Sequence, residues 1–181
     1  MISVKIDWKW IYWRSDYKWK DDIFPSLIDQ GLNISDLKNS VYVIRLNTPF
    51  AIQYPLGISP LIYIGEGNFQ SRISSHSKKW LCNLSEIIES SGLHIGVATP
   101  RSIENPNTYK DTEAALIHEF FNLYGTAPLN NKQYEYQKFD HDFDKKELRI
   151  ALTIGQGMKY KWAIKPMKAN IFYQHYHKTH D

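Results

Sequence analysis

Residues that could together hydrolyse a phosphodiester occur at intervals between positions 42 and 130 of this 181-residue chain. The reaction needs an activated water, neutralisation of the charge that grows on the phosphoryl oxygens, and stabilisation of the leaving oxygen. One carboxylate that holds a hard cation can supply much of this, because Mg²⁺ often uses only one or two protein carboxylates and keeps several waters. The candidate side chains are Tyr42, Tyr63, Arg72, His76, Glu113 and Asn130.

Two short strands are expected to carry the tyrosines. Ser40–Leu46 and Leu61–Gly65 are rich in β-branched and aromatic residues, as strands usually are. The segment between them contains three prolines and a glycine, which predicts a long loop that joins the two strands into a hairpin. After Gly65, the residues Phe69, Ile73 and His76 have helical spacing, so a helix is expected there.

One more strand follows this helix. Residues 81–90 either continue the helix or begin another, and Gly92 ends it. Leu93–Thr99 has the composition of a third strand, and residues 100–107 form a polar loop after it.

A long helix is then expected from Asp111, which can cap it, to about Tyr124, where Gly125 stops it. At 100° per residue, Glu113 shares a stripe with apolar residues, whereas Glu119 lies about 120° away from that stripe. A carboxylate on an inward stripe costs free energy unless something compensates it, and a metal ion would do so. Glu113 is therefore the preferred metal ligand; the apolar members of its stripe are Ile117, Phe120 and Tyr124.

The order strand, strand, helix, strand, helix, with these residues on it, resembles the catalytic core of the GIY-YIG nucleases over about residues 41–131. Tyr42 stands at the tyrosine of the first motif, with Ser40 and Val41 in place of the motif's glycine and isoleucine. The tripeptide Tyr63-Ile64-Gly65 matches the second motif in full.

The later motif positions resemble the family in the same order. Arg72 corresponds to the family's arginine, and His76 lies where some members carry a histidine. Glu113 resembles the metal-binding glutamate that opens an apolar helical run. Pro128-Leu129-Asn130 resembles the closing segment with its asparagine, although the adjacent Asn131 could take that place.

The resemblance implies an α/β (α+β) fold with a small, mainly antiparallel sheet flanked by helices, and an endonuclease that depends on Mg²⁺ or Mn²⁺. Tyr42 and Tyr63 would flank the attacking water, and Gly65 would lie beside the substrate. Arg72 would contact the scissile phosphate with its planar donors. His76 would relay a proton. Asn130 would hold the glutamate or a phosphate in place by a hydrogen bond.

Each of these residues also has a structural explanation. The tyrosines could be strand packing, Arg72 and His76 could be solvated helix residues, and Glu113 could complement a helix dipole. We expect DNA, and not RNA, as the preferred substrate. The alternatives to a restriction-type enzyme are a nucleic-acid-binding module that has kept the fold and lost activity, and a repair or homing nuclease.

The segments outside the core are expected to be extensions of a single domain, since 181 residues are few for two. In the first extension, residues 1–40, apolar side chains alternate from Val4 to Tyr12, which predicts a strand with one apolar face. Short helical pieces should follow it. Its candidates for contacts with DNA phosphates are Lys9, Arg14 and Lys18.

In the second extension, residues 132–181, the runs 148–154 and 158–164 flank a Gly-Gln-Gly turn and predict a hairpin. The second run alternates apolar residues with bases, so Lys159 and Lys161 form another strip that could contact phosphates. Both extensions could recognise the substrate or mediate dimerisation. A two-fold homodimer would let two active sites cut both strands of a duplex.

The composition, 43% hydrophobic and 23% charged, is that of a folded globular protein, and the net charge of +3 is a weak bias toward anionic partners. The single cysteine cannot form an intrachain disulfide, and the chain does not open with a secretion signal. Because no apolar run approaches the roughly 18 residues of a membrane span, we expect no membrane partner and a cytoplasmic location.

Overall fold

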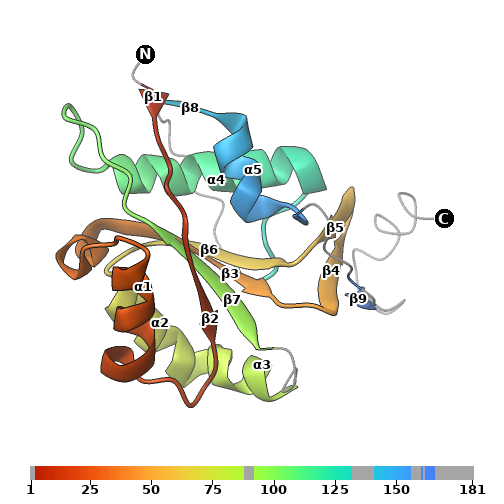
Figure 1. Ribbon diagram of the computed structural model, residues 1–181. Helices are drawn as coiled ribbons and strands as arrows, with labels where there is room; N and C mark the ends of the chain where they lie inside the picture. Colours follow the sequence, from red (N-terminus) through yellow and green to blue (C-terminus); the bar gives the residue numbers. More distant parts are fainter. Residues whose placement is uncertain (1–2, 88–91, 132–140, 156–159, 161, 166–181) are drawn as a thin grey trace.

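The structure is a computed structural model that describes residues 3–87, 92–131, 141–155, 160 and 162–165. Its centre is a four-stranded antiparallel sheet in the order β2-β7-β3-β6 (Figure 1). The fold is therefore mixed α/β with an antiparallel sheet, as the sequence predicted. The strands are β2 (Lys9–Trp13), β7 (Leu93–Ala98), β3 (Ser40–Leu46) and β6 (Leu61–Gly67).

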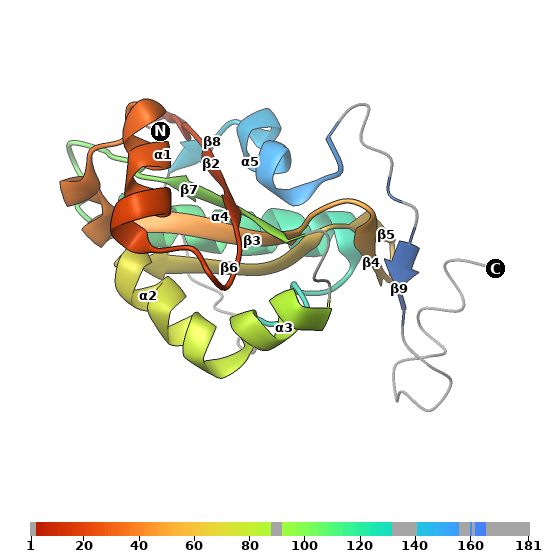
Figure 2. The ribbon, with the colours of Figure 1, turned by 60° about the horizontal axis from the view of Figure 1, so that its bottom comes forward.

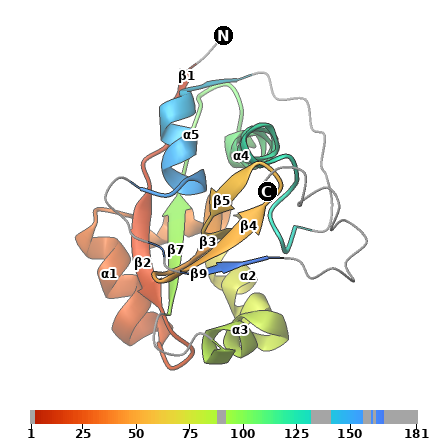
Figure 3. The same ribbon diagram turned by 90° about the vertical axis from the view of Figure 1, so that its right-hand side faces the viewer.

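Helices cover both faces of this sheet (Figure 2, Figure 3). On one face lie α2 (Phe69–His76) and α3 (Cys82–Ile87), joined by a π-helical turn, η3 (Ser77–Leu81). On the other face lie α4 (Thr108–Tyr124) and α5 (Lys145–Leu152).

The short helical pieces expected before β3 are present. They are a π-helical turn, η1 (Trp19–Ile23), then α1 (Phe24–Asp29) and a 3-10 turn, η2 (Ile34–Asn39). Just after α1, the side-chain amide of Gln30 bonds both backbone groups of Trp10, at 2.9 and 2.8 Å. These bonds satisfy the backbone N–H and C=O of Trp10 on the outer edge of β2, where no further strand pairs with it.

Every residue of β3 is buried. Because β3 is an interior strand with helices over both faces, its sequence is a nearly continuous apolar run instead of an alternating one. Arg45 is its charged residue, and the guanidinium donates to the carbonyls of Ile150 (2.9 Å) and Thr153 (2.7 Å) at the C-terminal end of α5. Its Cζ also lies 5.2 Å from the centre of the Trp10 ring. Arg45 thus ties α5 to the sheet.

The long helix α4 ends as predicted, with Gly125 in the left-handed region at φ 74°. Its start differs from the prediction, because the helix begins at Thr108 and Asp111 is not its cap. Asp111 instead accepts a hydrogen bond from Asn105 (2.7 Å) and contacts His141 Nδ1 at 2.8 Å. The apolar residues of the inward stripe are buried as predicted: Ile117, Phe120 and Tyr124. The inference drawn from this stripe for the two carboxylates is wrong, because Glu119 is buried and Glu113 is only half-buried.

The prediction of a long loop between β3 and β6 is wrong. The segment between these strands contains a hairpin, β4 (Phe50–Tyr54) and β5 (Gly57–Ser59), which forms a second sheet with β9 (Trp162–Ile164). The prolines suggested a loop, but they fall just outside these strands, where a missing N–H does not break the ladder. Their positions are Pro49, Pro55 and Pro60.

The hairpin predicted for residues 148–164 is also wrong. Lys145–Leu152 is the helix α5, capped by Asp144, whose carboxylate accepts from Lys146 N at 2.8 Å. Its buried residues are at helical spacing and not at strand spacing: Leu148, Ala151 and Leu152. The strand β9 runs parallel to β4, and the Trp162 and Ile164 side chains are exposed.

At the N-terminus the predicted strand is shorter than its pattern. A two-residue strand, β1 (Ser3–Val4), pairs with β8 (Asp142–Phe143), and a second strand begins only at Lys9. Burial alternates as predicted up to Trp8, but then slips by one residue to Ile11 and Trp13. Tyr12, expected on the apolar face, is only partly buried.

One cluster of buried apolar side chains runs from Val4 to Leu152 and so unites both extensions with residues 41–131. Within the described ranges, no helix has the length and apolar character that crossing a bilayer would require.

Candidate active site

A cavity of about 730 Å³ lies at the edge of the four-stranded sheet formed by β6. Because β6 is an edge strand, side chains from helices on both faces of the sheet can meet there: α2 supplies two of them and α4 supplies two more. Five of the six predicted catalytic residues line this cavity: Tyr63, Arg72, His76, Glu113 and Asn130.

The sixth residue, Tyr42, is fully buried in β3 beneath the cavity and does not line it. Its hydroxyl lies 2.9 Å from Nε2 of His76 and accepts a hydrogen bond from Nε of Arg72 at 3.4 Å. Nη2 of Arg72 also donates to the hydroxyl of Tyr63 at 3.3 Å. The expectation that Tyr42 flanks the attacking water is therefore corrected: Tyr42 holds in place the groups that face the cavity.

Gly65 has a steric role in this cluster. It pairs with Tyr42 across the β3–β6 ladder. A Cβ atom at this position would lie 2.5 Å from the Tyr42 hydroxyl and 2.6 Å from Cε1 of Tyr63. Only glycine lets the two phenols approach each other here, so the residue shapes the site from beneath. The predicted contact of Gly65 with substrate is not needed to explain it.

The hydrogen bonds of His76 fix which ring nitrogen carries its proton. The indole N–H of Trp80 donates to Nδ1 at 3.2 Å, and an indole nitrogen can only donate. Nδ1 is therefore unprotonated, and in the neutral ring the proton is on Nε2, from which it is donated to Tyr42. Burial, followed by the positive charges of Arg72 and Lys79, lowers the pKa of His76 to about 4, so the ring is neutral at pH 7.

Two further members of this cluster, Tyr42 and Arg72, keep their protons. Burial, followed by the neighbouring phenol Tyr63, raises the pKa of Tyr42 above its ordinary value, so Tyr42 is a neutral phenol. Burial alone would disfavour the charged form of Arg72, but its hydrogen bonds to the two phenols outweigh this effect and raise its pKa. A permanent positive charge thus sits at the wall of the cavity.

The two neighbouring asparagines have different roles. The Asn131 side chain accepts from Ile64 N at 2.9 Å and donates to Ile64 O at 2.8 Å, in the manner of an added strand along β6. The backbone N of Asn130 donates to Ile62 O at 3.0 Å, which holds the adjacent residue against the same strand. The side chain of Asn131 is thus committed to the backbone of β6, and Asn130 is the better candidate for a contact with substrate.

Glu113 and Glu119 occupy the two sides of α4. Glu119 is buried and accepts from Nε of Arg149, on α5, at 2.8 Å, so it serves helix packing. Glu113 lines the cavity, and the half-buried Glu66 at the end of β6 also lines it. Two carboxylates in one cavity fit a Mg²⁺ or Mn²⁺ ion, which needs only one or two from the protein. Within the described ranges, no group of three or more acidic, His or Cys ligands gathers.

Of the basic residues proposed for DNA contacts, the three that the structure describes do not line the cavity. Lys9 and Arg14 belong to β2 or follow it, at the opposite edge of the sheet from β6, and each pairs with a carboxylate, Asp7 at 2.9 Å and Asp16 at 3.3 Å. Lys18 is exposed ahead of η1. Lys159 and Lys161 lie outside the described residues.

Four residues that line the cavity were not predicted as site residues: Glu66, Lys79, Trp80 and the buried Ile117. Trp80 had a usable signal, because it follows His76 by one helical turn and an (i, i+4) pair shares a face. Glu66 had none, because a carboxylate directly after a strand is common. In comparisons with protein-family models, with curated proteins and with solved structures, the chain shows no significant match.

Proposed function

We propose that this chain is a metal-dependent endonuclease with a GIY-YIG-like core that hydrolyses phosphodiester bonds in DNA. The observation that carries the proposal is the meeting of Tyr63, Arg72, His76, Glu113 and Asn130 around one cavity, although they come from two helices, a strand and a loop. The sequence predicted these five residues from their types and order and from the resemblance to the nuclease core. A structural role for each residue singly gives no reason for all five to converge.

Arg72 binds the scissile phosphate in this proposal. Its bonds to Tyr42 and Tyr63 use two of the five N–H groups of a guanidinium and fix the plane of the group. The remaining N–H groups can then reach phosphate oxygens as charge-assisted donors, which are about twice as strong as neutral ones. The guanidinium is held in place before substrate arrives, so little reorganisation is needed in the transition state.

The phenols and the imidazole form a directional chain of hydrogen bonds. Tyr42 accepts from His76 and from Arg72, so its own proton can point toward the neighbouring ring of Tyr63. Tyr63 accepts from Arg72, which lets its own proton point outward. In this arrangement Tyr63 orients the attacking water or a phosphate oxygen by donating to it, and His76 supports the chain from below.

Glu113 would hold a Mg²⁺ or Mn²⁺ ion, and Glu66 is the second carboxylate at the same cavity, able to share that ion or to accept a proton from water. When bound, the cation supplies charge neutralisation at the phosphoryl oxygens and lowers the pKa of water. The Asn130 amide would orient a phosphate oxygen or the carboxylate of Glu113.

The test is incubation of the purified protein with supercoiled plasmid in Mg²⁺ and, separately, in EDTA, followed by gel analysis. We expect nicked or linear DNA only with Mg²⁺, and we expect less cutting of RNA. Arg72→Ala should lower the rate by about 10²-fold or more, as the loss of a transition-state donor does. Arg14→Ala is the matched control, because that guanidinium lies at the other edge of the sheet. DNA binding without cutting would instead identify a binding module and refute the enzyme.

A restriction-type enzyme would act as a homodimer, so that two copies of this single site cut opposite strands. Sedimentation of the protein with and without a duplex, combined with the ratio of linear to nicked product, tests this. A strict monomer that only nicks would refute the restriction-type version and leave the chemistry unchanged.

A further inference from the structure

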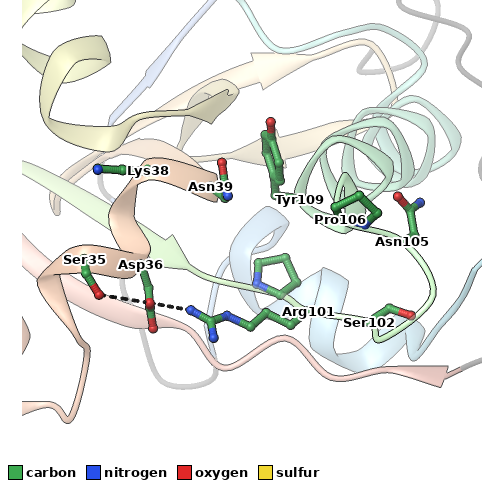
Figure 4. Close-up of a pocket in the computed structure, with 10 residues that line it drawn as sticks. Ser35, Asp36, Lys38, Asn39, Arg101, Ser102, Asn105, Pro106 and Tyr109 are labelled. Atoms are coloured by element: carbon green, nitrogen blue, oxygen red, sulfur yellow. Dashed lines mark hydrogen bonds and ion pairs between the residues drawn. The ribbon is translucent and has the colours of Figure 1, made fainter.

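A second pocket, of about 320 Å³, lies between η2 and the loop that joins β7 to α4 (Figure 4). Its lining is mainly polar and carries two cations and one carboxylate. The lining residues that matter here are Asp36, Lys38, Asn39, Arg101, Asn105 and Tyr109. None of them belongs to the cavity described above.

This pocket is a near neighbour of the cavity along α4. Tyr109 lines the pocket and Glu113 lines the cavity, and the two residues are one helical turn apart on the same face. Four residues of helix rise about 6 Å. One strand of B-DNA rises about 3.4 Å per nucleotide, so the separation corresponds to one or two nucleotides.

The pairing of β3 with β6 shows independently that the pocket and the cavity are neighbours. Asn39 of the pocket directly precedes Ser40, which pairs with Gly67 on β6, and the next pair is Val41 with Glu66 of the cavity. The hydroxyl of Ser40 also donates to Gly67 O at 2.8 Å, which fixes this corner. The pocket and the cavity therefore lie next to each other at the C-terminal end of β6.

We propose that this pocket binds a nucleotide of the DNA strand one or two positions from the scissile phosphate. The inference rests on the proposed function, and it assigns Lys38 and Arg101 to phosphate and the amide of Asn39 to a base edge. Amides of this kind can bond a base bidentately, and lysine and arginine contacts position the backbone. The Tyr109 ring provides an aromatic surface against which a sugar or a base can pack.

The ion pair across the pocket does not oppose this assignment. Figure 4 shows Arg101 reaching from the loop to Asp36 of η2, with which it forms an ion pair. The Arg101 side chain is 69% exposed, and an exposed pair of this kind contributes little stability. The guanidinium can therefore exchange Asp36 for a phosphate at small cost, while Asp36 keeps it directed over the pocket until DNA binds.

The test measures DNA affinity and its salt dependence for Lys38→Ala and Asn39→Ala, using the full chain and a labelled duplex in Ca²⁺ so that bound DNA stays intact. Lys145→Ala and Asn83→Ala are matched controls, because both residues are exposed on other helices. Lys38→Ala should weaken binding several-fold and reduce the salt slope by about 1, as the loss of one phosphate contact does. Asn39→Ala should weaken binding to only some sequences.

Cleavage in Mg²⁺ at saturating DNA gives the second readout. Both pocket variants should cut at nearly the wild-type kcat and with a raised KM. If their affinity and salt slope equal those of the control variants, the nucleotide pocket is refuted even if the wild type cuts DNA. If the wild type never cuts but Lys38→Ala still lowers affinity and salt slope, the pocket stands and the proposed nuclease activity fails.

Discussion

Gly65→Ala is the substitution that most sharply separates the geometry of the site from the stability of the fold. The added Cβ would lie 2.5 Å from the Tyr42 hydroxyl and 2.6 Å from the ring of Tyr63. Carbon atoms pack at about 3.5 Å or more, so the phenols must move by about 1 Å. Tyr42 cannot yield easily, because it is fully buried against Phe69, with ring centres 5.7 Å apart.

Overpacking of this kind costs about 1–3 kcal/mol of unfolding free energy. For a chain of this length, that corresponds to a fall in Tm of roughly 2–12 °C. The effect on cleavage should be larger than the effect on stability, because Arg72 is bonded to both displaced phenols. A misplacement of about 1 Å at a reacting group can lower the rate by about 10²-fold.

The assay compares urea unfolding and single-turnover DNA cleavage for three variants. Gly96→Ala is a matched overpacking control, because its Cβ would meet Trp10 at 2.8 Å and Val43 at 3.0 Å, away from the phenols. Gly57→Ala should be tolerated, because its nearest neighbour is 3.4 Å away on the Tyr124 ring. The reasoning is refuted if Gly65→Ala cuts DNA as fast as wild type, or if Gly96→Ala lowers the rate equally.

Three further predictions concern the groups around the site. Trp80→Phe removes the donor to Nδ1 of His76, so ¹⁵N spectra should show the ring in both tautomers and cleavage should slow; an unchanged ring spectrum would contradict the assignment. Because the pKa of His76 in the fold is about 4, below its value in the unfolded chain, the stability that this group contributes is present above about pH 6.5 and is lost as the pH falls toward 4. His76→Gln should remove that part of the pH dependence of unfolding, and an identical pH profile would argue against it. Arg149→Ala leaves the buried Glu119 carboxylate without its partner and should cost about 1–3 kcal/mol of unfolding free energy while kcat is unchanged; a variant that is stable but inactive would contradict the structural role of this pair.

The sequence predicted the elements that carry the site better than those around it. The strands at Ser40–Leu46 and near Leu61–Gly65 have residues that favour a single conformation, and Gly125 marks the end of α4 with a φ of 74°. Because these elements are local, periodicity alone could place Arg72 and Glu113 on their helices.

The errors arose where long-range packing decides the structure. The segment 148–154 could alternate as a strand, but burial of Leu148, Ala151 and Leu152 against the sheet makes it part of a helix. The β4–β5 hairpin is paired by β9, more than a hundred residues later in the chain, a contact that no local pattern contains. The burial of Tyr42 likewise depends on its contact with Phe69, which lies on another element and which no local pattern pairs with it.

The most direct test of the account is Mg²⁺-dependent cleavage of a plasmid by Glu113→Gln, measured beside its affinity for the same DNA. Glutamine keeps the size and helical position of the side chain and removes the charge that would hold the cation. The account predicts a variant that folds and binds DNA within a few-fold of wild type but cuts at least about 10²-fold more slowly. Cleavage at the wild-type rate in Mg²⁺ would contradict it.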